Sequence, residues 1–224
     1  MKCVHLDQVD KLNLTCLIQE FIYEQQPPSS NAHDIANLPQ FYEKITIHTT
    51  AIATFHAPSN LSGIGGMKCE CIHAVAHWQK CPGHYNTMFI NTASNNTSNN
   101  NGDSAVCRIL SLDLAQAHLF FSFALDGVKY QCALVHWFSH TIDMPHNVTG
   151  MHAVKPDCLP NSQPSTAVIH LDTVFRVVHP LPVFSAHPTP SKCQCFEPTL
   201  DLFSQFYINR YIDHHAFKVL IITL

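Results

Sequence analysis

The fold is decided by a stretch in the second half of the chain that reads HLFFSFALDGVKYQCALVHW, residues 118–137. Two β-rich runs, His118–Phe123 and Val128–Trp137, flank the pair Asp126–Gly127. An Asp-Gly pair supplies the positive φ angles that a tight hairpin turn needs. The stretch therefore predicts a β-hairpin, and it is the strongest β signal in the chain.

Shorter candidate strands surround this hairpin on both sides. They are Val106–Leu110, Met151–Val154, Val168–Leu171 and Val177–Phe184. Short, irregular strands within about one hundred residues favour a small closed barrel over an open sheet. An earlier stretch, Lys44–Thr49, alternates with period two and predicts a further strand.

Both ends of the chain carry helical patterns. Residues 11–26 place apolar side chains three and four positions apart, and Pro27 and Pro28 end the pattern because proline cannot continue a helix. Residues 199–218 carry an aromatic stripe that predicts a second helix. The apolar positions are Leu14, Leu17, Ile18, Phe21 and Ile22 in the first helix, and Leu200, Phe203, Phe206, Tyr207 and Tyr211 in the second.

The predicted fold class is α+β, with a small antiparallel β-barrel-like core flanked by an N-terminal and a C-terminal helix. We divide the chain into an N-terminal helical segment (1–30), a mixed strand, turn and helix segment (31–90), an Asn-rich disordered loop (91–103), a small β-barrel-like domain (104–187), and a Pro-rich turn with the C-terminal helix (188–224).

Composition excludes several classes of protein. Charged residues are 12% of the 224 residues and hydrophobic residues 46%, which excludes a charge-rich disordered tail and a coiled coil. The net charge of -4 provides no electrostatic footprint for nucleic acid. The chain has no signal-peptide pattern and no apolar run of about 20 residues, so we expect an intracellular protein with free thiols and no membrane contact.

Cysteine and histidine residues crowd one short stretch. The potential zinc ligands are Cys69, Cys71, His73, His77, Cys81 and His84, and a helix would place His73 and His77 on one face. The spacing matches no familiar zinc finger, and no second Cys-x2-Cys pair follows. The alternative, that these residues are incidental in a chain with 17 His and 10 Cys, is the stronger interpretation.

Five strings in the same order resemble the C-terminal part of fungal Plavaka-type transposases, which are DDE-type transposon proteins. The strings are Ala57–Met67, Leu119–Phe123, Cys132–Phe138, Val168–Asp172 and Asn209–Phe217, and the resemblance extends from about Leu12 to Phe217. It implies a parent protein that cuts and joins DNA with three carboxylates and two divalent metals. In the family that core lies upstream of the matched segment, so no catalytic residue, metal or cofactor is assigned to this chain.

The chain departs from the family pattern mainly at arginines. Family members read Met-Arg-Arg-Glu-Arg-Ile-Arg where this chain has Met67–His73, and Thr-Gly-Met-Trp where it has Thr149–His152. Single C-to-T changes convert CG-type arginine codons to Cys or His codons, as expected in silenced repeats, and three arginines remain: Arg108, Arg176 and Arg210. Mutational decay then explains the Cys and His excess and argues against zinc. It also predicts a weakened core at His152, since loss of a buried Trp costs about 3–5 kcal/mol.

The leading hypothesis is therefore a decayed, non-catalytic accessory fragment of a transposon-derived transposase, nuclear by resemblance, with DNA or other transposase segments as implied partners. The first alternative is a free-standing small-barrel module that binds a protein or nucleic acid, because Leu171–Phe175 resembles the lead into the last strand of chromatin-reader barrels. The second alternative is a zinc-stabilised structural protein.

Overall fold

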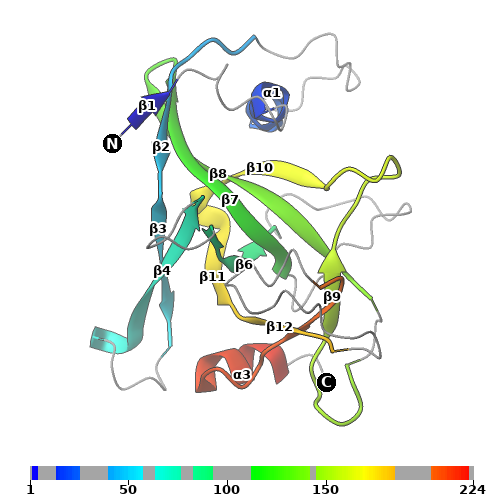
Figure 1. Cartoon of the computed structure of the whole chain (residues 1–224). Coiled ribbons are helices and arrows are strands. Elements are labelled where there is room, and N and C mark those ends of the chain that lie inside the picture. Colours follow the sequence, from blue (N-terminus) through cyan, green and yellow to red (C-terminus); the bar gives the residue numbers. More distant parts are fainter. Residues whose placement is uncertain are drawn as a thin grey trace.

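The computed structural model describes residues 2–4, 14–25, 40–57, 64–76, 83–92, 112–141, 145–184 and 203–221. Antiparallel strands make up most of it (Figure 1). The strands are β1 (Lys2–Val4), β2 (Ile45–His48), β3 (Thr50–His56), β4 (Met67–Val75), β5 (His84–Tyr85), β6 (Thr87–Asn91), β7 (Leu112–Leu125), β8 (Val128–His140), β9 (Ala153–Pro156), β10 (Thr166–His170), β11 (Val174–Val178), β12 (Pro180–Pro182) and β13 (Phe206–Ile208). The helices are α1 (Leu14–Glu24) and α3 (His214–Ile221), with 3-10 turns η4 (Ile64–Gly66) and η5 (Leu171–Thr173).

The predicted hairpin is confirmed as β7 and β8, the two longest strands described. Asp126 and Gly127 form its turn with φ angles of 50° and 78°, so the Asp-Gly pair adopts the left-handed conformation that a tight hairpin needs. Leu125 pairs with Val128 directly beside the turn. A register shift between Ala117 and Leu119 bends β7. This hairpin is the centre of the fold.

The strands form an antiparallel, barrel-like sheet that is nearly closed. β7 pairs with β2, β6 and β8, while β8 also pairs with β9 and β10, and β11 pairs with β6. A second sheet has the order β3-β4-β5. The rings of Phe55 on β3 and Phe175 on β11 lie 6.0 Å apart, so the two sheets meet there. The predicted barrel-like core is thus confirmed, and its strands come from both sides of the Asn-rich stretch.

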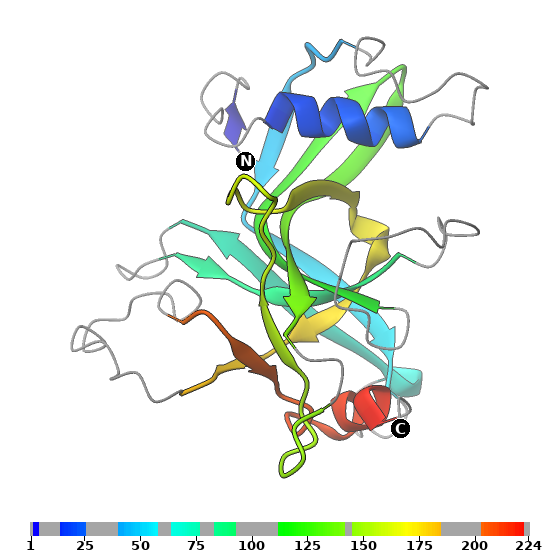
Figure 2. The same cartoon turned by 90° about the vertical axis from the view of Figure 1, so that its right-hand side faces the viewer.

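Small side chains fill much of the barrel interior and let the two sheets approach closely. This cluster is Ala51, Ala53, Ile72, Ala74, Met88, Ile90, Ala115, Ala117, Phe120, Ala133, Val135 and Val177. A second cluster lies under α1, and a third joins β9, β13 and α3. The two helices lie at opposite ends of the molecule in both views (Figures 1 and 2).

The N-terminal predictions agree with the structure. The helix predicted over 11–26 is α1, and its apolar stripe buries Leu14, Ile18, Phe21 and Ile22. The strand predicted over 44–49 is β2. The short strand β1, which pairs with β2, carried no signal that the sequence analysis used.

The C-terminal helix predicted over 199–218 is wrong for most of its described length. Phe206–Ile208 is strand β13, which pairs with β9 on one side and β12 on the other. Phe206 and Ile208 are buried on the same face of that strand, so tertiary pairing overrides the helical spacing. A helix forms only from His214, and residues 199–202 lie outside the described chain.

The remaining strand predictions fall close to observed elements. Val168–Leu171 corresponds to β10, Met151–Val154 to the start of β9, and Val177–Phe184 to parts of two strands, β11 and β12. Val106–Leu110 and residues 93–103 of the Asn-rich segment lie outside the described residues.

Candidate functional site

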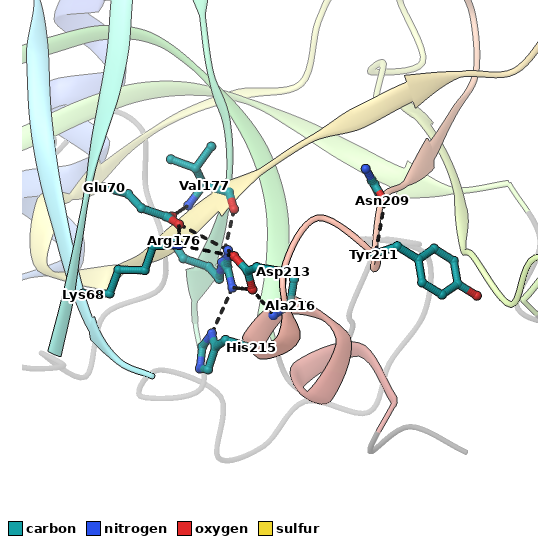
Figure 3. Close-up of polar contacts among 9 residues, drawn as sticks. All are labelled: Lys68, Glu70, Arg176, Val177, Asn209, Tyr211, Asp213, His215 and Ala216. Carbon is teal, nitrogen blue, oxygen red and sulfur yellow. Dashed lines mark hydrogen bonds and ion pairs between the residues drawn. The ribbon is translucent and has the colours of Figure 1, made fainter. Parts of the chain in front are cut away.

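A buried arginine gathers the main polar cluster, here called the Arg176 cluster. Arg176 lies on β11 with 1% of its side chain exposed. Its guanidinium donates hydrogen bonds to both carboxylate oxygens of Asp213 (3.3 and 2.8 Å), to Glu70 (3.2 Å) and to Nδ1 of His215 (2.9 Å). Figure 3 shows these side chains converging from β4, β11 and the start of α3. Segments distant in sequence therefore meet at one cation.

Strand alternation places the partners from β4. Lys68, Glu70 and Ile72 share the inward face of that strand, while residues 69, 71 and 73 lie on the opposite face. The second Glu70 oxygen accepts a hydrogen bond from the backbone N–H of Val177 at 3.1 Å. Lys68 lies 3.3 Å from Glu70 and 3.4 Å from Asp213, so it bridges the two carboxylates.

Asp213 also caps helix α3. One of its oxygens accepts a hydrogen bond from the backbone N–H of Ala216 at 2.7 Å, which satisfies a donor that the first helical turn leaves open. Partial burial acts to raise the pKa of Asp213, but the hydrogen bonds from Arg176 and Ala216 and the charges of Arg176 and Lys68 outweigh it. The pKa of this carboxyl therefore lies well below its usual range, and Asp213 is ionised.

His215 is held neutral by the same arginine. Because the guanidinium has only donors, Nδ1 of His215 must accept, which leaves the ring proton on Nε2. Burial lowers the pKa of His215, and the charge of Arg176 lowers it further. The imidazole of His215 stacks on the Phe55 ring with the ring centres 4.9 Å apart. The guanidinium carbon of Arg176 lies 4.8 Å from the centre of the Phe55 ring.

The Arg176 cluster is balanced in charge and directed inward. Lys68 and Arg176 face Glu70 and Asp213, and the imidazole lone pair of His215 already accepts a hydrogen bond. Such a cluster is suited to hold α3 against β4 and β11, because breaking a buried ion pair is strongly unfavourable. The geometry of the cluster fits a structural role, and the lone pair of His215 is already used by Arg176.

A second arginine anchors the loop before β9. Arg210 donates a hydrogen bond to the carbonyl of Gly150 at 2.7 Å, and Tyr211 donates one to the carbonyl of Thr149 at 2.6 Å. Gly150 has a φ of +63°, and a Cβ there would lie 2.7 Å from the Arg210 guanidinium. The positive φ favours glycine at this position, because other residues rarely adopt that conformation. Arg176 and Arg210, the two described arginines, are both buried. Arg176 contacts Asp213 just before α3, and Arg210 contacts Gly150 in the loop before β9.

The six potential zinc ligands are only partly described. Cys69 and Cys71 are exposed on the outer face of β4, and the rings of His73 and His84 lie 5.2 Å apart on β4 and β5. His73 belongs to a strand, so the helical spacing predicted for it is wrong; His77 and Cys81 lie outside the described residues. Within the described ranges, no group of three or more His, Cys, Asp or Glu is placed to hold a metal ion.

Other imidazoles pair across strands, which the sequence analysis missed. His118 and His136 lie 5.9 Å apart on β7 and β8, and His140 and His152 lie 5.4 Å apart. Burial and the neighbouring His136 lower the pKa of His118 to about 4. Burial, His140 and Arg210 lower the pKa of His152. No local spacing signals these pairs, because the fold brings together residues that lie 18 and 12 positions apart in the chain.

Comparison with known proteins yields no matching family model, and no curated protein or solved structure is significantly similar to the chain. In the described parts of the chain, no helix has the length and apolar character needed to cross a bilayer.

Proposed function

We propose that the chain is a non-catalytic interaction module derived from the C-terminal region of a Plavaka-like transposase, and that it works by binding a partner. The observation that carries the proposal is the Arg176 cluster. It joins Glu70, which agrees with the family pattern within the otherwise departing stretch Met67–His73, to Asp213 and His215, from the last of the five strings. Two residues of the last string and one that agrees with the family pattern thus contact the same arginine.

The departures from the family pattern along β4 leave the ion pairs of its inward face in place. The family pattern has arginine at the positions of Cys69, Cys71 and His73, which share the outer face of the strand. Glu70 and Ile72, which agree with the pattern, point inward. Lys68, on the inward face, also stands where the family pattern has arginine, but it keeps the positive charge that Glu70 and Asp213 contact.

Charge favours a protein partner over DNA. Phosphate binding needs clustered Lys and Arg, whereas the chain has a net charge of -4 and both described arginines are buried. The outer face of β4 offers thiols and an imidazole instead of the three arginines of the family pattern. We therefore propose an intracellular, nuclear protein that binds other proteins.

Three measurements test the proposal against its alternatives. Purified chain should unfold in one cooperative thermal transition, while a featureless melt would favour the decayed fragment. Sequencing several kilobases of genomic DNA on both sides of the reading frame should show an isolated frame without a carboxylate core or mutational bias, as expected for a captured domain. An upstream carboxylate core with terminal inverted repeats and an excess of CG-to-TG changes would instead favour the decayed fragment. Near-stoichiometric zinc after purification without chelator would instead favour the zinc-stabilised alternative.

A further inference from the structure

Strand β3 has one edge with which no described strand pairs. Its other edge pairs with β4. The backbone N–H of Ala74 donates to the carbonyl of Thr49 at 3.0 Å, and that of Ala57 donates to the carbonyl of Gly66 at 2.6 Å. In an antiparallel ladder every second residue bonds to the same neighbour. The odd residues of β3 therefore bond to β4, and the backbone groups of Thr50, Ile52 and Thr54 point to the open edge.

A groove runs along this edge. A cavity of about 270 Å³ lies between residues 51–54 of β3 and Leu171, Asp172 and Val174 of η5 and β11. A second cavity of about 160 Å³ shares Ala51, Gln131 and Leu171 with the first, so the two adjoin. Figure 2 shows η5 beside β3 on the same side of the molecule. The contact between Phe55 and Phe175 closes the space between β3 and β11 further along.

The chemistry of the groove suits an extended peptide. β3 carries neither a charged residue nor proline, which are the features that block strand addition at natural sheet edges. Ile52 is 66% exposed beside the open backbone groups. Asp172, with 86% of its side chain exposed, is the one formally charged residue among those that line the two cavities. A cationic side chain on the ligand would complement it.

We infer that this groove binds an extended segment of a partner protein, which adds as a strand to β3 and places a Lys or Arg opposite Asp172. The inference rests on the proposed function of the chain as an interaction module. Strand addition uses main-chain hydrogen bonds for affinity and neighbouring side chains for specificity. A second folded copy fits less well, because its own η5 stands along the same edge of its β3.

The test uses the full chain labelled with ¹⁵N and two capped peptides, Thr-Val-Thr-Lys-Thr-Val-Thr and the same peptide with Glu in place of Lys. The Lys peptide should shift the amide resonances of residues 50–54 and 171–174. It should also bind about two- to fivefold more tightly than the Glu peptide, the range of an exposed ion pair. Asp172→Lys should reverse the preference, while Glu43→Lys, an equal charge change at an exposed site outside the groove, should preserve it.

A proline pair tests the direction of the backbone groups. Ile52→Pro removes an N–H that points to the open edge, so it should abolish peptide binding while the cooperative melt persists. Ala53→Pro removes a bond to β4 and should lower the melting temperature markedly.

Several results would overturn the inference. They are an absence of shifts with millimolar peptide, shifts confined to other strands, a peptide preference that Asp172→Lys leaves unchanged, and dimerisation through β3 in sedimentation experiments. A chain that melts cooperatively but fails these binding tests rejects the groove alone. A chain without a cooperative melt rejects the proposed module itself.

Discussion

Replacement of Arg176 by methionine removes the cation on which the C-terminal corner converges. The side chain is 1% exposed, and its loss would leave Glu70 and Asp213 without their shared donor. Breaking a buried ion pair by removing one partner costs about 3–5 kcal/mol. Lys68 still bridges the two carboxylates, which are 15% and 23% exposed, so we expect the lower end, about 3 kcal/mol.

The assay is urea and thermal unfolding of the full chain at pH 7. For a chain of this size, a loss of about 3 kcal/mol corresponds to a melting temperature lower by about 6–12 °C. Lys129→Met removes an exposed cation on β8 and serves as the matched control, with an expected change within about 0.5 kcal/mol. Arg176→Met combined with Asp213→Asn should cost less than the sum of the single changes, because the two residues share one interaction.

The pH dependence of the same corner has a definite sign. The pKa of Asp213 in the folded chain lies below the ordinary value of 3.8, so the folded state binds fewer protons than the unfolded one. The stabilisation from Asp213 is therefore complete above about pH 4 and is lost as the pH falls further. Asp213→Asn should remove this acid dependence. An Arg176→Met variant as stable as the wild-type chain would refute the whole argument.

Three further predictions follow from other parts of the fold. Burial and His136 lower the pKa of His118 from 6.5 to about 4, so the unfolded chain takes up this proton first as the pH falls. The free energy of unfolding should therefore drop by up to about 3 kcal/mol between pH 6.5 and 4, as measured by urea titration. His118→Phe should reduce this drop. Gly127→Ala should destabilise the chain by about 1 kcal/mol in thermal melts because Gly127 has a φ of +78°; an unchanged melt would contradict the observed turn. Burial raises the pKa of the Cys132 thiol to about 12, so iodoacetamide at pH 8 should label exposed Cys69 and Cys158 but spare Cys132 until the chain unfolds, as read by mass spectrometry.

Sequence pattern and observed structure differ most clearly at the C-terminus. Phe203, Phe206 and Tyr207 have helical spacing, yet Phe206–Ile208 is a strand because β9 and β12 flank it. Short apolar segments carry both periods, and the available pairing partners decide between them. In the same way, His73 became part of β4 through pairing with β3 and β5, not part of a helix.

Local chemistry in the sequence determined the hairpin at Asp126–Gly127, the apolar face of α1 and the antiparallel barrel-like class. Each depends on neighbouring residues, through turn dihedrals or through the period of apolar side chains. The Arg176 cluster was decided only by tertiary structure, because Glu70 and Asp213 lie 106 and 37 residues from Arg176 in the chain. The groove beside β3 likewise exists only once η5 folds against an edge whose backbone groups are left open.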